Sequence, residues 1–142
     1  MLHLEFNSES DNERIARIVT AAYIMKFDPD MEEMEDIKTA VSEAVTNCIV
    51  HAYFDTSGKI QMDLTDEDGV LKIEIKDQGV GILDIKKAMQ PMYTTKPEEE
   101  RTGMGFSFME AFMDKVEVVS KPGAGTKVIM IKKMGAAEKL NG

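Results

Sequence analysis

An alternating run of apolar and polar residues, ended by an aspartate and two glycines, is the feature that most constrains the fold. In this run Leu71, Ile73 and Ile75 share one parity, so in a strand they point to one face. Asp77 keeps that parity and would turn its carboxylate toward the apolar side. A buried carboxylate is costly without hydrogen-bond donors, and glycines let the backbone turn sharply or let a ligand approach. Residues 77–81, which hold both glycines, therefore predict a ligand site.

The length and composition are those of one globular domain. The chain has 142 residues, of which 43% are hydrophobic and 30% charged, so residues 1–142 are expected to form a single domain with a real core. No run approaches the length of a membrane span, and the first residues lack the layout of a signal peptide. The one cysteine, Cys48, cannot form an internal disulfide, which favours a cytoplasmic protein. Its apolar surroundings favour a small core residue.

The acidic balance restricts the partners. A net charge of -9 argues against non-specific binding to nucleic acid, and it is compatible with a basic protein partner. The 12 methionines suit an irregular core or an adaptable surface but select no partner. No direct contact with nucleic acid or with a membrane is expected.

Periodicity and turn signals predict the order of elements. Strands are expected at residues 1–6, 60–64, 70–77, 115–120 and 126–132. Helices are expected from a cap at Ser8 or Ser10 to residues 27–30, from a cap at Asp30 through residues 31–51, and at residues 82–88 and 106–113. Residues 90–102 form a long loop without regular pattern, and residues 134–142 form a frayed tail. This order predicts the α+β class, as a two-layer α/β sandwich with a mixed, largely antiparallel sheet. It contains no βαβ repeat, which disfavours a doubly wound nucleotide-binding fold.

The long helix at residues 31–51 is expected to have two faces. An apolar stripe recurs at helical spacing: Met34, Ile37, Val41, Val45, Cys48 and Ala52. Roughly opposite, Glu43 and Asn47 lie one turn apart, and the residues that follow Glu43 up to position 50 carry no charge. A helix that is apolar nearly all round is buried, so these two residues predict a second buried surface that is polar.

Several patterns together fit a nucleotide site. The Asp77 carboxylate can accept a hydrogen bond from an exocyclic amino group, which adenine has, and Gly79 and Gly81 let the base edge approach the backbone. At residues 103–105, a Gly-Met-Gly turn at a helix start offers free N–H groups to a phosphate.

Cations and a candidate base complete this set. Lys96 and Arg101 bring positive charge to the loop before the Gly-Met-Gly turn. The side-chain oxygen of Asn47 suits a hard cation such as Mg²⁺, which prefers oxygen ligands and keeps water. Glu43, one turn away, could be a general base if its pKa is suitably placed.

Each pattern also has a purely structural interpretation. D-x-G-x-G occurs in ordinary turns, G-x-G before a helix can be a cap, and Glu43 with Asn47 can be a hydrogen-bonded pair under a loop. His51 is more often a satisfied, partly buried histidine than a catalyst, and the charges of residues 96–101 can be solvated. The sequence has no G-x-x-x-x-G-K-[ST] loop, no H-R-D kinase signature and no His/Cys cluster with zinc spacing. The functional interpretation therefore depends on the consistent order of the patterns.

That order resembles a large ATPase/kinase superfamily that includes gyrase, a heat-shock chaperone, histidine kinases and a mismatch-repair ATPase. Residues 43–47 resemble its asparagine box, residues 77–81 its first glycine box, residues 101–106 its second, and residues 125–126 the short motif on its last strand. The fuller strings SEAVTN, QPMYTTKP and GMGF narrow the resemblance to the sporulation anti-sigma F factors, and it runs over nearly the whole chain.

The resemblance implies a Bergerat-type ATP-binding fold and two activities. The chain would be a serine protein kinase whose phosphate acceptor is a serine on an anti-anti-sigma protein. It would also sequester a sigma factor as a stoichiometric inhibitor, usually as a homodimer. Asp77 would bind the adenine amino group with Gly81 and Thr126 beside it, Asn47 would hold Mg²⁺ at the phosphates of ATP, and Glu43 would activate the serine hydroxyl.

The resemblance also implies a lid and a partner contact. The lid and phosphate contacts would come from one stretch: Thr95, Lys96, Arg101, Gly103, Met104, Gly105 and Phe106. Arg17, on the first helix, is the candidate partner contact. The chain departs from the family at Cys48, which follows the asparagine box, and at residues 51–53, where a glycine is expected after the histidine. Neither departure removes a chemical group that the mechanism needs.

Three other functions stay open. A histidine-kinase or ATPase module predicts an attached helix pair with a phosphoacceptor histidine, or a long transducer domain, and 142 residues leave room for neither. A nucleotide-dependent binding module without turnover would not need Glu43. A stress-response anti-sigma serine kinase of the same superfamily is the nearest alternative.

Overall fold

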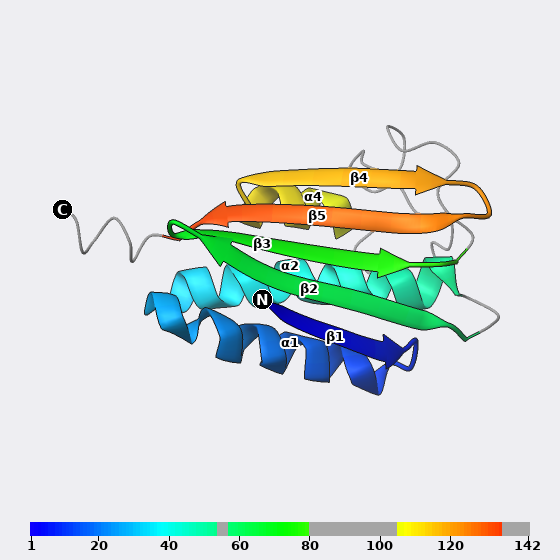
Figure 1. Cartoon of the computed structure of the whole chain (residues 1–142), viewed down its shortest axis with the longest axis horizontal. Helices are drawn as coiled ribbons and strands as arrows, with labels where there is room; N and C mark the ends of the chain where they lie inside the picture. The colour runs from blue at the N-terminus through cyan, green and yellow to red at the C-terminus, as the bar shows by residue number, and fades with distance from the viewer. Residues whose placement is uncertain (54–56, 80–104, 135–142) are drawn as a thin grey trace.

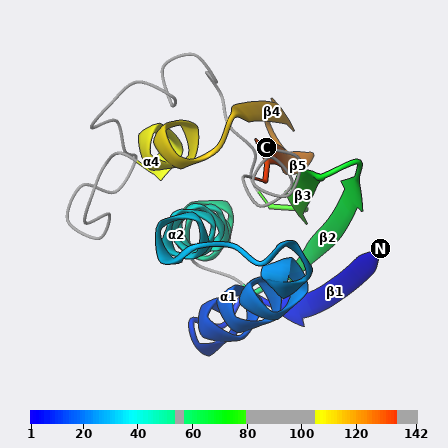
Figure 2. The ribbon, with the colours of Figure 1, turned by 90° about the vertical axis from the view of Figure 1, so that its left-hand side faces the viewer.

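The computed structural model describes residues 1–53, 57–79 and 105–134. Its elements, in chain order, are β1 (Leu2–Asn7), α1 (Asp11–Ile24), the 3₁₀ turn η1 (Met25–Phe27), α2 (Met31–Asn47), the π-helical turn η2 (Cys48–Ala52), β2 (Lys59–Glu67), β3 (Val70–Asp77), α4 (Gly105–Phe112), β4 (Lys115–Lys121) and β5 (Gly125–Lys133). The sheet has the strand order β1-β2-β3-β5-β4 (Figure 1). In the described part of the chain, α1, α2 and α4 all cover the same face of the sheet, with α2 in the middle (Figure 2). The two-layer α+β sandwich is confirmed.

The sheet is more uniform than the sequence predicts. All neighbouring pairs among the described strands are antiparallel, so the expectation of a mixed sheet was wrong for this part of the chain. β3 and β4 do run in the same direction, but β5 lies between them. The crossover from β3 to β4 skips one place in the sheet, and β5 fills that place as an antiparallel partner of both.

β3 has the alternation that its sequence predicts. Leu71, Ile73 and Ile75 are buried and Lys72 is exposed, as expected for a strand with one covered face. β3 pairs with β2 through a tight hairpin in which Glu67 lies opposite Val70. Both residues of its turn, at positions 68 and 69, have positive φ, which is typical of two-residue hairpins with Asp-Gly.

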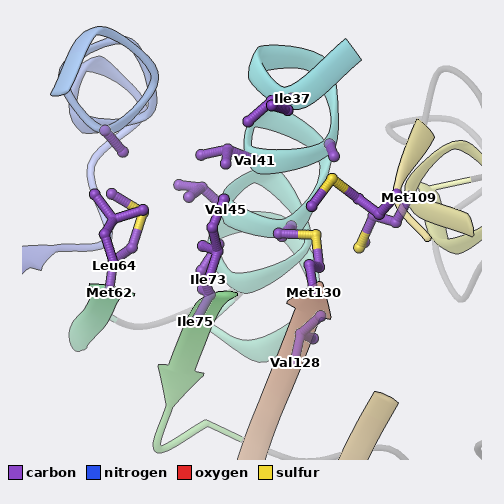
Figure 3. Packing of buried hydrophobic residues seen from close by; sticks show 14 of the residues in the cluster. Ile37, Val41, Val45, Met62, Leu64, Ile73, Ile75, Met109, Val128 and Met130 are labelled. Atoms are coloured by element: carbon purple, nitrogen blue, oxygen red, sulfur yellow. The ribbon is translucent and has the colours of Figure 1, made fainter. Parts of the chain in front are cut away.

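The core lies between α2 and the central strands (Figure 3). Ile37, Val41 and Val45 of α2 face Ile73 and Ile75 of β3. Further buried side chains come from β2, α4 and β5: Met62, Leu64, Met109, Val128 and Met130. The methionines are thus part of the core, where their flexible side chains fill irregular space. The packing fixes α2 across the sheet, so that its C-terminal end lies over the end of β3.

The helix starts confirm one predicted cap and contradict the others. Asp30 caps α2, because its side chain accepts from the Glu33 backbone N–H at 2.8 Å and Glu33 reaches back to the Asp30 backbone N–H. Ser10 stands at the N-cap position of α1 but makes no side-chain cap hydrogen bond. The Ser8 hydroxyl instead accepts from the Gly58 backbone N–H at 3.0 Å. The serine cap was therefore a wrong prediction, since Ser8 ties the end of β1 to the start of β2.

Some of the remaining predictions concern residues that the structure describes, and others concern residues outside that part of the chain. The expected helix at residues 31–51 is confirmed, although its last turn is the π-helical η2. Met134 was expected in a frayed tail, but it is fully buried and its backbone N–H donates to Gly69 at 2.9 Å. The predicted helix 82–88, the loop 90–102 and residues 135–142 lie outside the described residues. Within the described residues, no helix is long and apolar enough to cross a membrane.

Candidate functional site

The Asp77 carboxylate lies in the apolar layer, as its parity predicts. Asp77 is the last residue of β3, opposite Ile60 on one side and Thr126 on the other, and it is only 4% exposed. Its Oδ1 accepts two backbone hydrogen bonds, from the Gly79 N–H at 2.9 Å and from the Thr126 N–H at 3.2 Å. The predicted need for donors is thus met partly by the chain itself.

A third donor comes from Cys48, which the sequence indicates only as a core residue. The Cys48 Sγ donates to Asp77 Oδ2 over 3.4 Å, and Cys48 is 4% exposed. Burial, and secondarily the charge of Asp77, raises the pKa of Cys48 well above its ordinary value, so the thiol keeps the proton that it donates. The apolar stripe on α2 was a signal for this contact, because it places Cys48 over the sheet.

Burial and hydrogen bonding act on Asp77 in opposite directions. Burial raises the pKa of the Asp77 carboxyl above its ordinary value, while the hydrogen bonds from Gly79, Cys48 and Thr126 act to lower it. The net effect is a raised pKa. Asp77 is therefore a carboxylate under a desolvation cost, which a further hydrogen-bond donor would reduce.

Glycines at two positions allow three backbone segments to meet around Asp77. A Cβ on Gly79 would lie 2.4 Å from the Ala52 carbonyl oxygen, and a Cβ on Gly125 would lie 2.2 Å from the Asp77 carbonyl oxygen. Gly125 also has a φ of 88°, which favours glycine. The sequence predicts that Gly79 lets a base edge approach. The structure shows that Gly79 is needed for the close approach of η2, and the approach of a base stays a prediction.

Two hydroxyl contacts hold the backbone on either side of Asp77. The Tyr53 hydroxyl accepts from the Gln78 N–H at 2.6 Å and donates to the Lys59 carbonyl at 2.8 Å. On β5, the Thr126 hydroxyl lies 2.7 Å from that of Ser120. The sequence indicates no function for Tyr53 or Ser120, because both contacts join residues from different segments.

Glu43 and Asn47 are placed on α2 as predicted, one turn apart, and both are half-buried. Asn47 is the last residue of α2 and directly precedes Cys48, so it lies next in the chain to the Asp77 contact. The surface predicted as a second buried face is therefore partly open. No cluster of three or more His, Cys, Asp or Glu side chains within the described residues could hold a metal ion.

Arg17 lies on α1 and is paired within its own helix. Its Nε donates to Glu13 Oε2 at 3.1 Å, and Glu13 Oε1 accepts from the Ser42 hydroxyl at 3.0 Å. Because Ser42 precedes Glu43, this chain of contacts connects Arg17 to the part of α2 that carries the candidate base.

The lid residues fall largely outside the described part of the chain. This holds for six of the predicted site residues: Gly81, Thr95, Lys96, Arg101, Gly103 and Met104. Gly105 is the first residue of α4, as the predicted glycine turn at a helix start requires. Phe106 packs against the hydrophobic core.

A separate hollow of about 330 Å³ lies near the same end of the sheet. Its lining includes Glu5, Gln61 and Lys76, which are opposite one another on β1, β2 and β3. Lys76 and Asp77 are neighbours in a strand, so their side chains point to opposite faces. The hollow therefore opens on the face of the sheet that the helices do not cover, away from the Asp77 carboxylate.

Comparison with known proteins identifies the family. Residues 6–132 match the histidine kinase-like ATPase domain. The chain is 54% identical to an anti-sigma F factor of Caldanaerobacter subterraneus subsp. tengcongensis, covering 95% of this chain and 94% of that protein. It is 47% identical to the anti-sigma F factor of Bacillus subtilis, covering 98% and 96%. The chain belongs to the anti-sigma F factor family.

Solved structures share the fold of this chain. The crystal structure of the RsbU and RsbW domains of a Mycobacterium tuberculosis protein matches with a TM-score of 0.63 at 19% identity, over 94% of this chain and 33% of that chain. The catalytic domain of histidine kinase ThkA matches with a TM-score of 0.59 at 20% identity, over 94% and 97%. At these identities the likeness shows the fold alone.

The site of this anti-sigma F factor fits the nucleotide that an ATPase domain of this type implies. Counting partners from residues 1–53, 57–79 and 105–134, the carboxylate of Asp77 has acceptor capacity left at Oδ2, in a buried place where a purine amino group would be a favourable partner. Asn47 could supply one oxygen ligand to Mg²⁺ through its side-chain carbonyl. Mg²⁺ commonly takes few protein ligands and completes its shell with water and phosphate.

Proposed function

We propose that this anti-sigma F factor is a serine protein kinase that transfers the γ-phosphate of ATP to an anti-anti-sigma protein. The observation that carries the proposal is the buried Asp77 carboxylate with its three donors. A carboxylate under this desolvation cost is suited to bind an amino group such as that of adenine. Its contact with Cys48 links base recognition to Asn47 and Glu43 on the preceding turns of α2.

The roles of the residues follow from this arrangement. Asp77 accepts from the adenine amino group, and Thr126 holds the neighbouring backbone of β5. Asn47 would hold Mg²⁺, which supplies charge neutralisation at the phosphates when it is bound. Glu43 takes the proton of the attacking serine hydroxyl. Phosphoryl transfer depends mainly on alignment and electrostatics, so one helix that carries both groups a turn apart is a suitable support for them.

The remaining contacts belong to the stretch before α4. The cations Lys96 and Arg101 would balance phosphate charge, and Thr95 and the glycine turn at residues 103–105 would close over the nucleotide. Gly81 would lie beside Asp77 at the adenine. Phe106 would support this closure from the first turn of α4. These roles rest on the family resemblance of the motifs, and they place the phosphate end of ATP near the N-terminus of α4, where a helix favours anions.

Glu43→Ala is the test of the kinase mechanism. Transfer of label from γ-labelled ATP and Mg²⁺ to a serine of the anti-anti-sigma protein should be lost, while ATP binding measured by calorimetry should be retained. Glu35→Ala is the matched control, because Glu35 is an exposed carboxylate on the same helix. Unchanged transfer in Glu43→Ala would contradict the role of Glu43. Binding of ATP without any transfer by the unmodified protein would favour a binding module.

The second proposed activity is the sequestration of a sporulation sigma factor by a homodimer in the cytoplasm. Arg17 is the proposed contact on α1, where Arg14 is a neighbouring exposed arginine that serves as the control. Arg17→Ala should weaken capture of the sigma factor in a binding assay, and Arg14→Ala should weaken it less. If both substitutions weaken capture equally, Arg17 is not a specific contact, and the positive charge of α1 attracts the sigma factor only in a general way.

A further inference from the structure

The two oxygens of the Asp77 carboxylate accept different numbers of hydrogen bonds. A carboxylate has about four lone-pair sites, two on each oxygen. Oδ1 accepts from two backbone N–H groups, at 2.9 Å and 3.2 Å, and Oδ2 accepts from the Cys48 thiol at 3.4 Å. Within the described residues, the free acceptor site therefore lies on Oδ2, the oxygen that Cys48 contacts.

We propose that Cys48 is a positioning residue for purine recognition, and that it holds Asp77 with Oδ2 presented to the exocyclic amino group of the nucleotide. The inference rests on the proposed nucleotide-binding function. It adds that Oδ2 is the atom of Asp77 that meets the amino group and that Cys48 is the residue that positions it. Cys48 would act through Asp77, without touching the nucleotide itself.

The surroundings of Cys48 make it a fixed donor. It is the first residue of η2 and lies in the core cluster, so packing restricts the direction of its side chain. Its Sγ donates to Asp77 Oδ2 over 3.4 Å, and Cys48 is only 4% exposed. A protonated thiol is a weak donor, which can orient Oδ2 while leaving its second acceptor site open.

This arrangement predicts selectivity at one position of the purine ring. An amino group donates to the free site on Oδ2, whereas an oxo group at the same position would bring an acceptor toward a carboxylate. A site built around one hydrogen bond discriminates strongly against an analogue that lacks the donor. The ratio of the affinities for ATP and inosine triphosphate therefore reports how well Oδ2 is positioned. A residue that only fills the core would change stability without changing this ratio.

The test is calorimetric titration of ATP and inosine triphosphate into the unmodified protein and three variants. Cys48→Ala should lower the ATP preference roughly threefold to tenfold, as expected for one lost hydrogen bond. Cys48→Ser, which keeps a donor, should restore most of the preference. Val41→Ala is the control for packing, because Val41 is buried on the same helix face and should change stability but not the ratio.

Several outcomes overturn the inference. If Cys48→Ala keeps the full ATP preference, Cys48 does not position Asp77, although the proposed nucleotide binding stands. If the unmodified protein binds ATP without any preference over inosine triphosphate, the assignment of Oδ2 fails. If it binds neither nucleotide, the proposed function fails as well.

A spectroscopic measurement tests the contact without a change at Cys48. The chain has one cysteine, so its infrared spectrum contains one S–H stretching band. The band should lie at lower frequency in the unmodified protein than in Asp77→Asn, because a hydrogen bond to a carboxylate weakens the S–H bond. An identical band in the two proteins would overturn the contact.

Discussion

The Asp77 side chain carries an electrostatic cost, because its carboxyl group is buried in the apolar layer. Burial holds its pKa above the ordinary value of 3.8, so the folded protein binds this proton more tightly than the unfolded chain does. The carboxyl therefore favours folding fully below about pH 3.8, and this contribution is lost as the pH rises through the raised pKa. At neutral pH the fold is therefore less stable than it would be with this carboxyl group protonated.

Asp77→Asn should separate binding from stability. The free energy of unfolding of the variant, relative to the unmodified protein, should increase as the pH rises from below 4 to 7, because the variant lacks the titrating carboxyl. ATP affinity at pH 7 should fall at least about tenfold, since an amide cannot reproduce the acceptor set. Urea titrations across this pH range and calorimetry measure the two effects. A relative stability that falls with pH would contradict the raised pKa, and an unchanged affinity would contradict the adenine assignment.

Two glycines of the turn between β4 and β5 form a matched pair for substitution: Gly123 lies in the turn, and Gly125 is the first residue of β5. Gly123 has a φ of 77° and open space around it, whereas Gly125 has a φ of 88° and the Asp77 carbonyl close by. Gly123→Ala should cost about 1–2 kcal/mol, the usual penalty of a left-handed residue. Gly125→Ala should cost at least about twice as much and also weaken ATP binding. The free energy of unfolding of both variants is measured by chemical denaturation. An equal decrease in the two would show that the backbone moves at little cost to remove the clash between a Cβ at position 125 and the Asp77 carbonyl oxygen.

Single residues divide clearly into those that the sequence could predict and those that it could not. Asp77 follows from the strand parity, because its orientation depends only on neighbours in the chain. The donors Cys48 and Thr126 come from η2 and β5. The apolar stripe on α2 indicates that Cys48 faces the sheet, and the family resemblance implies that Thr126 lies beside Asp77. The hydrogen bonds themselves join segments far apart in the chain, and no local pattern records them. The same limit explains why Tyr53 was missed.

At the scale of elements, the two helix starts show which capping signals are sufficient. Asp30 and Glu33 form a capping box at α2, and both partners lie within one turn. Ser10 has the right residue type at α1 but no cap hydrogen bond, and Ser8 bonds to Gly58 on another segment. A reciprocal pair is therefore the better predictor of a helix start.

These two caps predict different costs. Asp30→Ala should lower the free energy of unfolding by about 1 kcal/mol, because it leaves the first N–H groups of α2 without their acceptor. Ser10→Ala is the matched control at the other N-cap and should change stability by less than about 0.5 kcal/mol. Urea unfolding measures both. An equal loss in the two variants would mean that the cap geometry is not what stabilises these helices.

At the scale of the whole molecule, the sequence predicts two layers but not the strand order. Alternation and helical periodicity identify which residues face the core, and this sufficed for the α+β sandwich. The position of β5 between β3 and β4 depends on the crossover after β3, which periodicity does not record. Since the sheet is antiparallel throughout its described strands, Thr126 at the start of β5 comes to lie beside Asp77 at the end of β3.

A nucleotide held between these elements should stabilise the entire fold. ATP with Mg²⁺ at 100 times its dissociation constant should raise the free energy of unfolding by about 2.7 kcal/mol, visible as a higher melting temperature. Uridine triphosphate, a pyrimidine nucleotide that lacks the adenine edge, is the control ligand and should have a smaller effect. Chelation of Mg²⁺ should reduce the stabilisation by ATP. A melting temperature that is independent of ATP would contradict the proposed site.

The eight-residue length of β3 has a consequence for insertions and deletions. The two-residue turn at positions 68 and 69 fixes where β3 begins, and Asp77 points inward only because it lies an odd number of steps from Val70. Removing one residue from the strand would turn Asp77 outward and a lysine inward. Length variation in homologous chains should therefore be absent between this turn and Asp77, even where the individual residues differ.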